Sequence, residues 1–100
     1  MGIQESMKEY VEFIVKNLVD EQDDVNINVF ISTKAIVIQI KTAKGDCGKV
    51  IGRKGRTIDA IKVLALATKN TKFPEDSKSI SIEISEEENV DIKKNTKLWR

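Results

Sequence analysis

Alternating hydrophobic and polar residues predict the strands of this chain. Valine or isoleucine occupies every second position from Val25 to Ile31, and isoleucine does so again between Ala35 and Ile40. A period of two places one side of each strand in the core. Residues 32–34 are turn-like, so we expect these two strands to form an antiparallel hairpin. The alternation returns over residues 80–84 and predicts a third strand.

A different spacing predicts a helix near the start of the chain. Ser6 and Glu9 fit the capping box, in which the two side chains satisfy free amides at a helix start. Apolar residues then recur at helical spacing as one stripe, formed by Met7, Tyr10, Val11, Ile14, Val15 and Leu18. The acidic residues from Asp20 to Asp24 are expected in the loop beyond this helix, because acids oppose the dipole at a helix C-terminus.

Two further helices are predicted in the second half. Asp46 can cap a short helix that ends at Ile51. The next helix is expected to run from about residue 56 or 57 to Thr68 and to bury Ile58, Ile61, Leu64 and Ala65. Residues 70–78 contain the only proline, Pro74, and are expected to form a connecting loop.

These elements give the order α-β-β-α-α-β. One three-stranded sheet packed on three helices predicts a single two-layer α+β domain. We place the domain at residues 6–86, after an N-terminal extension of residues 1–5 and before a C-terminal tail of residues 87–100. The tail is a basic segment without a clean period, and its Leu98 and Trp99 also suit docking onto a partner.

Charge is unevenly distributed along the chain. The net charge is only +1, but six of the seven charged residues between Lys41 and Arg56 are basic. Acidic residues gather instead at 20–24 and 83–91. The near-neutral total therefore conceals a local basic patch, which suits a local contact with an anion better than a wrapping surface.

The basic patch is centred on a pair of glycines. Gly52 and Gly55 bracket Arg53 and Lys54. Glycine permits sharp turns and close approach of another backbone, and lysine and arginine donate charge-assisted hydrogen bonds to phosphate oxygens. The spacing predicts a turn that binds a phosphodiester backbone, although glycines that merely break helices are the structural alternative.

The segment Val50-Ile-Gly-Arg-Lys-Gly-Arg-Thr-Ile58, in this element order, resembles the KH domain. Its I-G-x-x-G centre is the signature loop of that family, and the predicted element order resembles the type II arrangement. The segment from Glu9 to Val19 and the segment from Gly48 to Ile61 look like the KhpA subfamily of small stand-alone bacterial KH proteins. The resemblance covers roughly residues 6–86.

This resemblance implies binding of single-stranded RNA and a post-transcriptional influence on cell division or cell shape. It also implies a partner, a larger RNA-binding protein of the Jag/KhpB kind. A homodimer or a heterodimer formed through an exposed helix face is compatible with the sequence.

A KH domain binds about four nucleotides along its G-x-x-G loop. We expect the backbone amides of the turn and the cations Arg53 and Lys54 to contact phosphates, with Lys49 and Arg56 as flanking charges. Apolar side chains beside the turn and one face of the second strand are expected to line a groove for the bases. The predicted RNA-binding residues are Lys49, Val50, Ile51, Gly52, Arg53, Lys54, Gly55, Arg56 and Ile58.

Other classes of site fit the sequence less well. The spacing of the glycines matches neither a Walker A loop nor a dinucleotide-binding fingerprint. The chain has no histidine to activate its single cysteine, Cys47, which we expect to be a packing residue. We therefore expect no enzyme, no metal and no cofactor. No apolar run approaches membrane-spanning length, and the cytoplasm is the expected location. The competing hypothesis is a protein-interaction scaffold in which RNA binding is secondary.

Overall fold

A mixed three-stranded sheet forms one layer of the domain. The computed structural model describes residues 2–86, so the predicted tail lies outside the described residues. The strands are β1 (Asn26–Ile31), β2 (Ala35–Thr42) and β3 (Ser79–Glu86), in the spatial order β1-β2-β3. β1 and β2 form the predicted antiparallel hairpin, whereas β3 pairs parallel to β2. A parallel pair needs a crossover connection, and the helices of the second half provide it.

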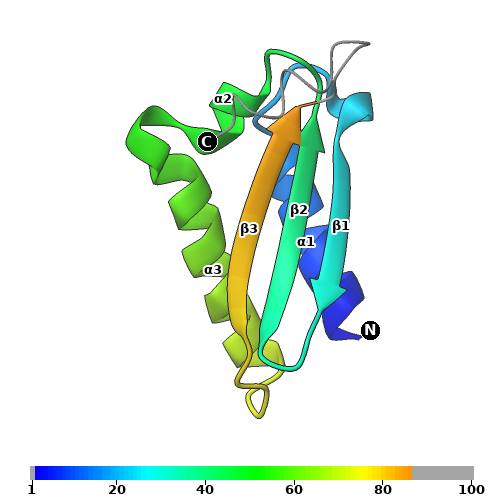
Figure 1. Ribbon diagram of the computed structural model, residues 1–100, viewed down its shortest axis with the longest axis vertical. Coiled ribbons are helices and arrows are strands. Elements are labelled where there is room, and N and C mark those ends of the chain that lie inside the picture. The colour runs from blue at the N-terminus through cyan, green and yellow to red at the C-terminus, as the bar shows by residue number, and fades with distance from the viewer. Residues whose placement is uncertain (1, 87–100) are drawn as a thin grey trace.

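The helices form the second layer. α1 (Ile3–Lys16) packs against β1, α3 (Arg56–Lys72) packs against β3, and the two helices contact each other. The short α2 (Cys47–Ile51) lies above them at the end of the sheet where α3 begins (Figure 1). A 3₁₀ turn, η1 (Gln22–Asp24), connects α1 to β1, and a second, η2 (Arg53–Gly55), connects α2 to α3. The predicted α+β fold and element order are confirmed.

The core lies between the sheet and the two long helices. The inward isoleucines of the strands meet the apolar stripe of α1, as the alternation and the helical spacing predict. Together with Val50 of α2, the buried apolar residues of these elements are Met7, Val11, Val15, Ile27, Val29, Ile36, Ile38, Ile40, Ile61, Ala65 and Ile80. Tyr10, Ile14 and Leu18 are only partly buried at its margin.

The start of α1 differs from the prediction. Gly2 occupies the N-cap position, and the amide of Ser6 donates to the carbonyl oxygen of Gly2 at 3.0 Å as an ordinary helical hydrogen bond. Ser6 is buried within the helix, so the predicted capping box is wrong. Residues 3–5, expected to lie in an extension, form the first turn of α1. Leu18 lies beyond the helix end, because α1 ends at Lys16.

α3 is one turn longer than predicted, and one predicted core residue is exposed. The helix continues past Thr68 to Lys72, and the loop is shortened to residues 73–78. Leu64, predicted to be buried, is 53% exposed, whereas Lys69 is 1% exposed. The buried face of α3 thus runs through Ile61, Ala65 and Lys69 at intervals of four residues.

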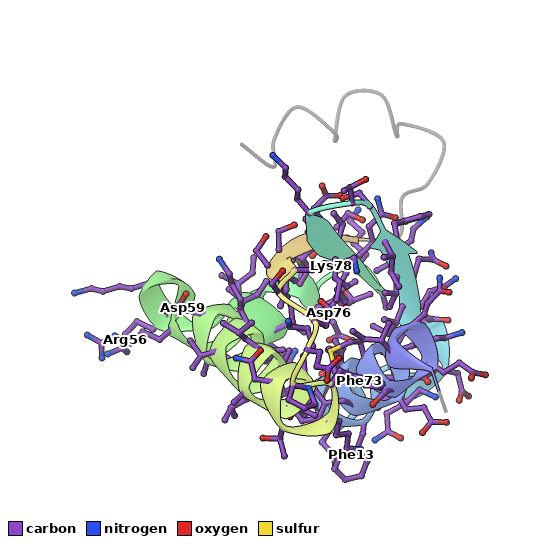
Figure 2. The ribbon with its side chains drawn as sticks, turned by 90° about the horizontal axis from the view of Figure 1, so that it is seen from below. Phe13, Arg56, Asp59, Phe73, Asp76 and Lys78 are labelled. Atoms are coloured by element: carbon purple, nitrogen blue, oxygen red, sulfur yellow. The ribbon has the colours of Figure 1, made fainter. Side chains whose placement is uncertain are left out.

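The buried Lys69 organises the loop that leads into β3. Its Nζ donates to the carbonyl oxygen of Asp76 at 2.6 Å and lies 3.4 Å from Oδ1 of the same residue. The Asp76 carboxylate also accepts the amide of Lys78 at 2.8 Å and pairs with the Lys78 ammonium at 3.1 Å, in the loop labelled in Figure 2. These contacts, chiefly the hydrogen bond from the Lys78 amide, lower the pKa of Asp76. A buried lysine is tolerated because its charge is paired.

Candidate nucleic-acid interface

The glycine turn joins α2 to α3 through a backbone conformation that requires glycine. α2 ends at Gly52, whose φ and ψ are 78° and 172°, a region that is essentially restricted to glycine. A Cβ at Gly52 would lie 2.2 Å from Thr57 Oγ1 and 2.9 Å from the Thr57 amide nitrogen. The close packing of Gly52 against the first turn of α3 therefore fixes the angle between the two helices.

The next residues turn the chain into α3. Lys54 (φ 57°, ψ 23°) and Gly55 (φ 75°, ψ 14°) both adopt left-handed conformations. Lys54 is the only described residue other than glycine with a positive φ. A residue with a Cβ in the left-handed conformation lowers the free energy of unfolding by about 1–2 kcal/mol. The fold therefore holds Lys54 at the tip of the turn at a cost in stability.

Three cations are presented by this geometry. Arg53, Lys54 and Arg56 are all exposed, and none forms an ion pair with another residue in the described range 2–86. Figure 2 shows Arg56 projecting away from the body of the protein at the start of α3. These side chains are free to meet an incoming anion.

The backbone at the start of α3 adds to this positive region. α3 has 17 residues, and its N-cap residue Gly55 has no side chain to satisfy the first amides of the helix. Such amides lack intrahelical partners, and the helix dipole adds partial positive charge at this end. The amides of Gly55 and Arg56 already donate to the carbonyl oxygens of Gly52 and Arg53, so the turn combines side-chain cations with the positive end of the helix dipole.

The predicted groove for the bases needs a correction. Val50 is 0% exposed and packs in the core, so its side chain cannot line a groove. The apolar face of β2 is likewise buried, through Ile36, Ile38 and Ile40. Only Ile51 and Ile58, both partly exposed, lie beside the turn with apolar surface available.

Lys49 is engaged by two carboxylates, which the sequence did not reveal. Its Nζ lies 3.2 Å from Asp20 Oδ2 and 3.3 Å from Asp46 Oδ1. The hydrogen bonds to Asp20 and Asp46 raise the pKa of Lys49. Lys49 therefore differs from the three unpaired cations, although it was predicted to serve beside them.

Asp46 occupies the predicted N-cap position of α2 but does not make the capping hydrogen bond. Its Oδ2 instead accepts the backbone amide of Glu21 at 3.0 Å. This hydrogen bond is the main reason why the pKa of Asp46 is lowered. The carboxylate fastens the loop after α1 to the start of α2.

Catalytic chemistry has little support in the described part of the chain. Burial, assisted by the nearby charge of Glu86, raises the pKa of Cys47 to about 11, so the thiol stays protonated and unreactive near neutral pH. No cluster of acidic or cysteine side chains within residues 2–86 could hold a metal ion. In the same range, no helix is both long and apolar enough to cross a bilayer.

Sequence comparisons identify related proteins. The family model described as "KhpA/KhpB, KH domain" matches residues 8–84. An RNA-binding protein KhpA from Chlamydia trachomatis is 42% identical over 81 residues, covering 81% of this chain and 99% of the relative. The protein of the same name from Clostridium perfringens is 44% identical over 68 residues, covering 66% of this chain and 91% of the relative.

Solved structures share the fold at low sequence identity. Aquifex aeolicus Era, bound to GDP and AlF4⁻, aligns with a TM-score of 0.61 at 13% identity over 86% of this chain. Era in complex with MgGDPNP and nucleotides 1506–1542 of 16S ribosomal RNA aligns with a TM-score of 0.59, also at 13% identity. The chain spans 31% of the length of either Era chain, so the likeness concerns only that part of Era.

Proposed function

Because the chain belongs to the KhpA/KhpB KH-domain family, we propose that it binds single-stranded RNA at the turn from Gly52 to Gly55. The observation that carries this proposal is a set of exposed cations, without ion-pair partners among residues 2–86, on a turn whose backbone is held in place by Gly52. Relatives that cover most of this chain are named RNA-binding proteins, which supports the same conclusion.

In the proposed complex, about four nucleotides lie along the turn. Arg53, Lys54 and Arg56 contact phosphates, and the first amides of α3 donate to phosphate oxygens. These contacts position the strand without selecting a sequence. Ile51 and Ile58 pack against the bases. Because residues 47–58 include no aromatic ring on which bases could stack, we expect modest affinity and weak base preference.

The decisive test replaces both cations at the tip of the turn. Arg53→Asp with Lys54→Asp should reduce affinity for a labelled, unstructured oligoribonucleotide by about a hundredfold or more, because two charge-assisted hydrogen bonds are lost and two repulsive charges are added. The fold should survive, since aspartate is among the residues that tolerate the left-handed conformation of Lys54. Fluorescence anisotropy measures the affinity and circular dichroism checks the fold.

A matched control distinguishes a local contact from a change in net charge. Lys8→Asp with Lys34→Asp makes the same change in charge at exposed positions on α1 and in the β1–β2 turn. The β1–β2 turn lies at the end of the sheet opposite the glycine turn, and α1 begins at that end (Figure 1). This variant should bind RNA nearly as well as the wild type. If both folded variants lost RNA affinity equally, the turn would not be the RNA-binding site.

We further propose that the protein is a non-catalytic, cytoplasmic, post-transcriptional regulator that acts with a Jag/KhpB-like partner and affects cell division or cell shape. A partner or a second copy of the chain requires an exposed surface. Phe13 on α1 and three apolar residues of α3 are exposed on neighbouring helices and support such an association; these residues are Val63, Leu64 and Leu66.

The same exposed residues favour a second candidate function, a scaffold in which RNA binding is secondary. RNA crosslinking in cells, with the wild type and the variant carrying aspartate at positions 53 and 54, separates the two functions. If the phenotype persists when crosslinking is lost but disappears when the partner is deleted, the scaffold is favoured. If it disappears with crosslinking, RNA binding is the primary function.

A further inference from the structure

Two polar contacts join the loop after α1 to the start of α2 beside the glycine turn, and a third lies within the start of α2 itself. The Glu21 amide donates to Asp46, and the Lys49 ammonium pairs with both Asp46 and Asp20, all at 3.0–3.3 Å. The Asp20–Lys49 pair joins residues that are far apart in sequence, and it brings the first acidic cluster to the basic patch. A carboxylate therefore lies at the margin of the proposed RNA site.

The two carboxylates differ in exposure. Asp46 is 3% exposed and carries the structural link between the loop and α2. The Asp20 side chain is 72% exposed and that of Lys49 is 45% exposed. The Asp20–Lys49 contact can be removed without opening the link made by Asp46, because the hydrogen bond from the Glu21 amide to Asp46 does not involve the Asp20 side chain.

Lys49 lies close to the turn along the helix. Gly52 follows it by three positions, which is slightly less than one turn of helix, or about 4.5 Å of rise. A lysine side chain is long and flexible, so without Asp20 the ammonium keeps only Asp46 as a carboxylate partner and can turn toward a phosphate beyond the end of α2.

We propose that Asp20 withholds Lys49 from RNA and so limits the number of phosphates that the glycine turn neutralises. This inference rests on the proposed RNA-binding function. It adds a contact within the protein that limits the affinity for RNA. Asp20 is a positioning residue, which acts on RNA only through Lys49. A phosphate and the Asp20 carboxylate compete for the exposed side of an ammonium that Asp46 contacts as well.

The test is a salt titration of RNA binding by Asp20→Asn. One additional phosphate contact should steepen the dependence of log K on log salt by about 0.7. The gain in affinity over the wild type should then be about 2.6-fold larger at roughly 50 mM salt than at roughly 200 mM salt. The wild type and the variant are measured with the same short oligoribonucleotide.

Two controls separate a released lysine from a general change in charge. Asp23→Asn makes the same change in charge in the same loop, at a residue with no ion pair among those described. It should leave the slope unchanged. Lys49→Met should have little effect by itself and should abolish the gain in the Asp20→Asn background.

The inference is overturned if Asp20→Asn and Asp23→Asn give the same slope, or if Lys49→Met alone lowers affinity, which would mean that Lys49 already contacts RNA. The variant with aspartate at positions 53 and 54 is titrated alongside. If that variant loses binding while Asp20→Asn has no effect on the slope, only the role of Asp20 is refuted. If the wild type itself does not bind, both proposals fail.

Discussion

Replacing Gly52 with alanine tests whether the turn is held by close packing against α3. Gly55→Ala is the matched control, because the two glycines flank the same two cations and both have positive φ values. A Cβ at Gly52 would overlap Thr57, whereas a Cβ at Gly55 would meet nothing within 4 Å. The two substitutions therefore add the same methyl group to very different surroundings.

The expected magnitudes follow from these surroundings. At Gly52 the backbone conformation costs an alanine about 1–3 kcal/mol. The overlap with Thr57 adds about 1–3 kcal/mol, since one of the overlapping atoms is the backbone nitrogen and cannot rotate away. At Gly55 only the left-handed conformation counts, at about 1–2 kcal/mol. A domain of this size has about 4–13 kcal/mol of stability in total, so Gly52→Ala removes a large share of it.

Urea denaturation followed by circular dichroism measures both free energies of unfolding. Removing the Thr57 side chain in the Gly52→Ala background should restore only part of the loss, because the contact with the backbone nitrogen at 2.9 Å remains. Equal destabilisation by Gly52→Ala and Gly55→Ala would refute the packing argument and leave backbone conformation as the only constraint on the turn.

Two further predictions concern groups outside the turn. Asp76→Asn should lower stability at pH 7, because it weakens the pairing of the buried Lys69. The pKa of Asp76 is lowered on folding, so its contribution is present above the ordinary carboxyl pKa and is lost as pH falls through the folded value. The difference in free energy of unfolding between wild type and variant, measured by urea denaturation, should therefore become smaller in acid. A difference that does not change with pH would contradict this account. Native Cys47, with a pKa of about 11, should be alkylated by iodoacetamide at pH 8 at least about a hundredfold more slowly than in the urea-unfolded chain; similar rates would show that the thiol is accessible and ionisable.

Local periodicity was sufficient to predict the architecture. The strands alternate clearly because the sheet buries one face, and α1 carries a clear apolar stripe because it covers that face. The turn between Gly52 and Gly55 was recognisable because both positions have positive φ values, which favour glycine. These features are encoded within a few consecutive residues, where spacing alone is informative.

The errors arose where distant residues decide the outcome. Lys69 was unrecognisable as a buried residue because its partner, Asp76, lies in the following loop. Lys49 was assigned to RNA because it flanks the turn in a basic segment, and this assignment stays a prediction; no local pattern reveals its contact with Asp20, 29 residues earlier. Val50 has the spacing of a groove residue and of a core residue alike, and only the packing of α2 onto the sheet distinguishes them.

The end of α3 shows how polar composition misleads. Asn70 and Thr71 are poor helix formers, so a loop was predicted from residue 70. The pairing of Lys69 with the loop after the helix stabilises this last turn and outweighs the local preference. Tertiary contacts of this kind routinely override propensity.

The parallel pairing of β3 with β2 has a consequence for biosynthesis. The glycine turn lies within the crossover that joins these two strands, so both ends of the crossover are anchored only when β3 has added to the sheet. A nascent chain still attached to the ribosome should therefore complete the hairpin early and acquire a competent turn only after residues 79–86 have emerged from the exit tunnel.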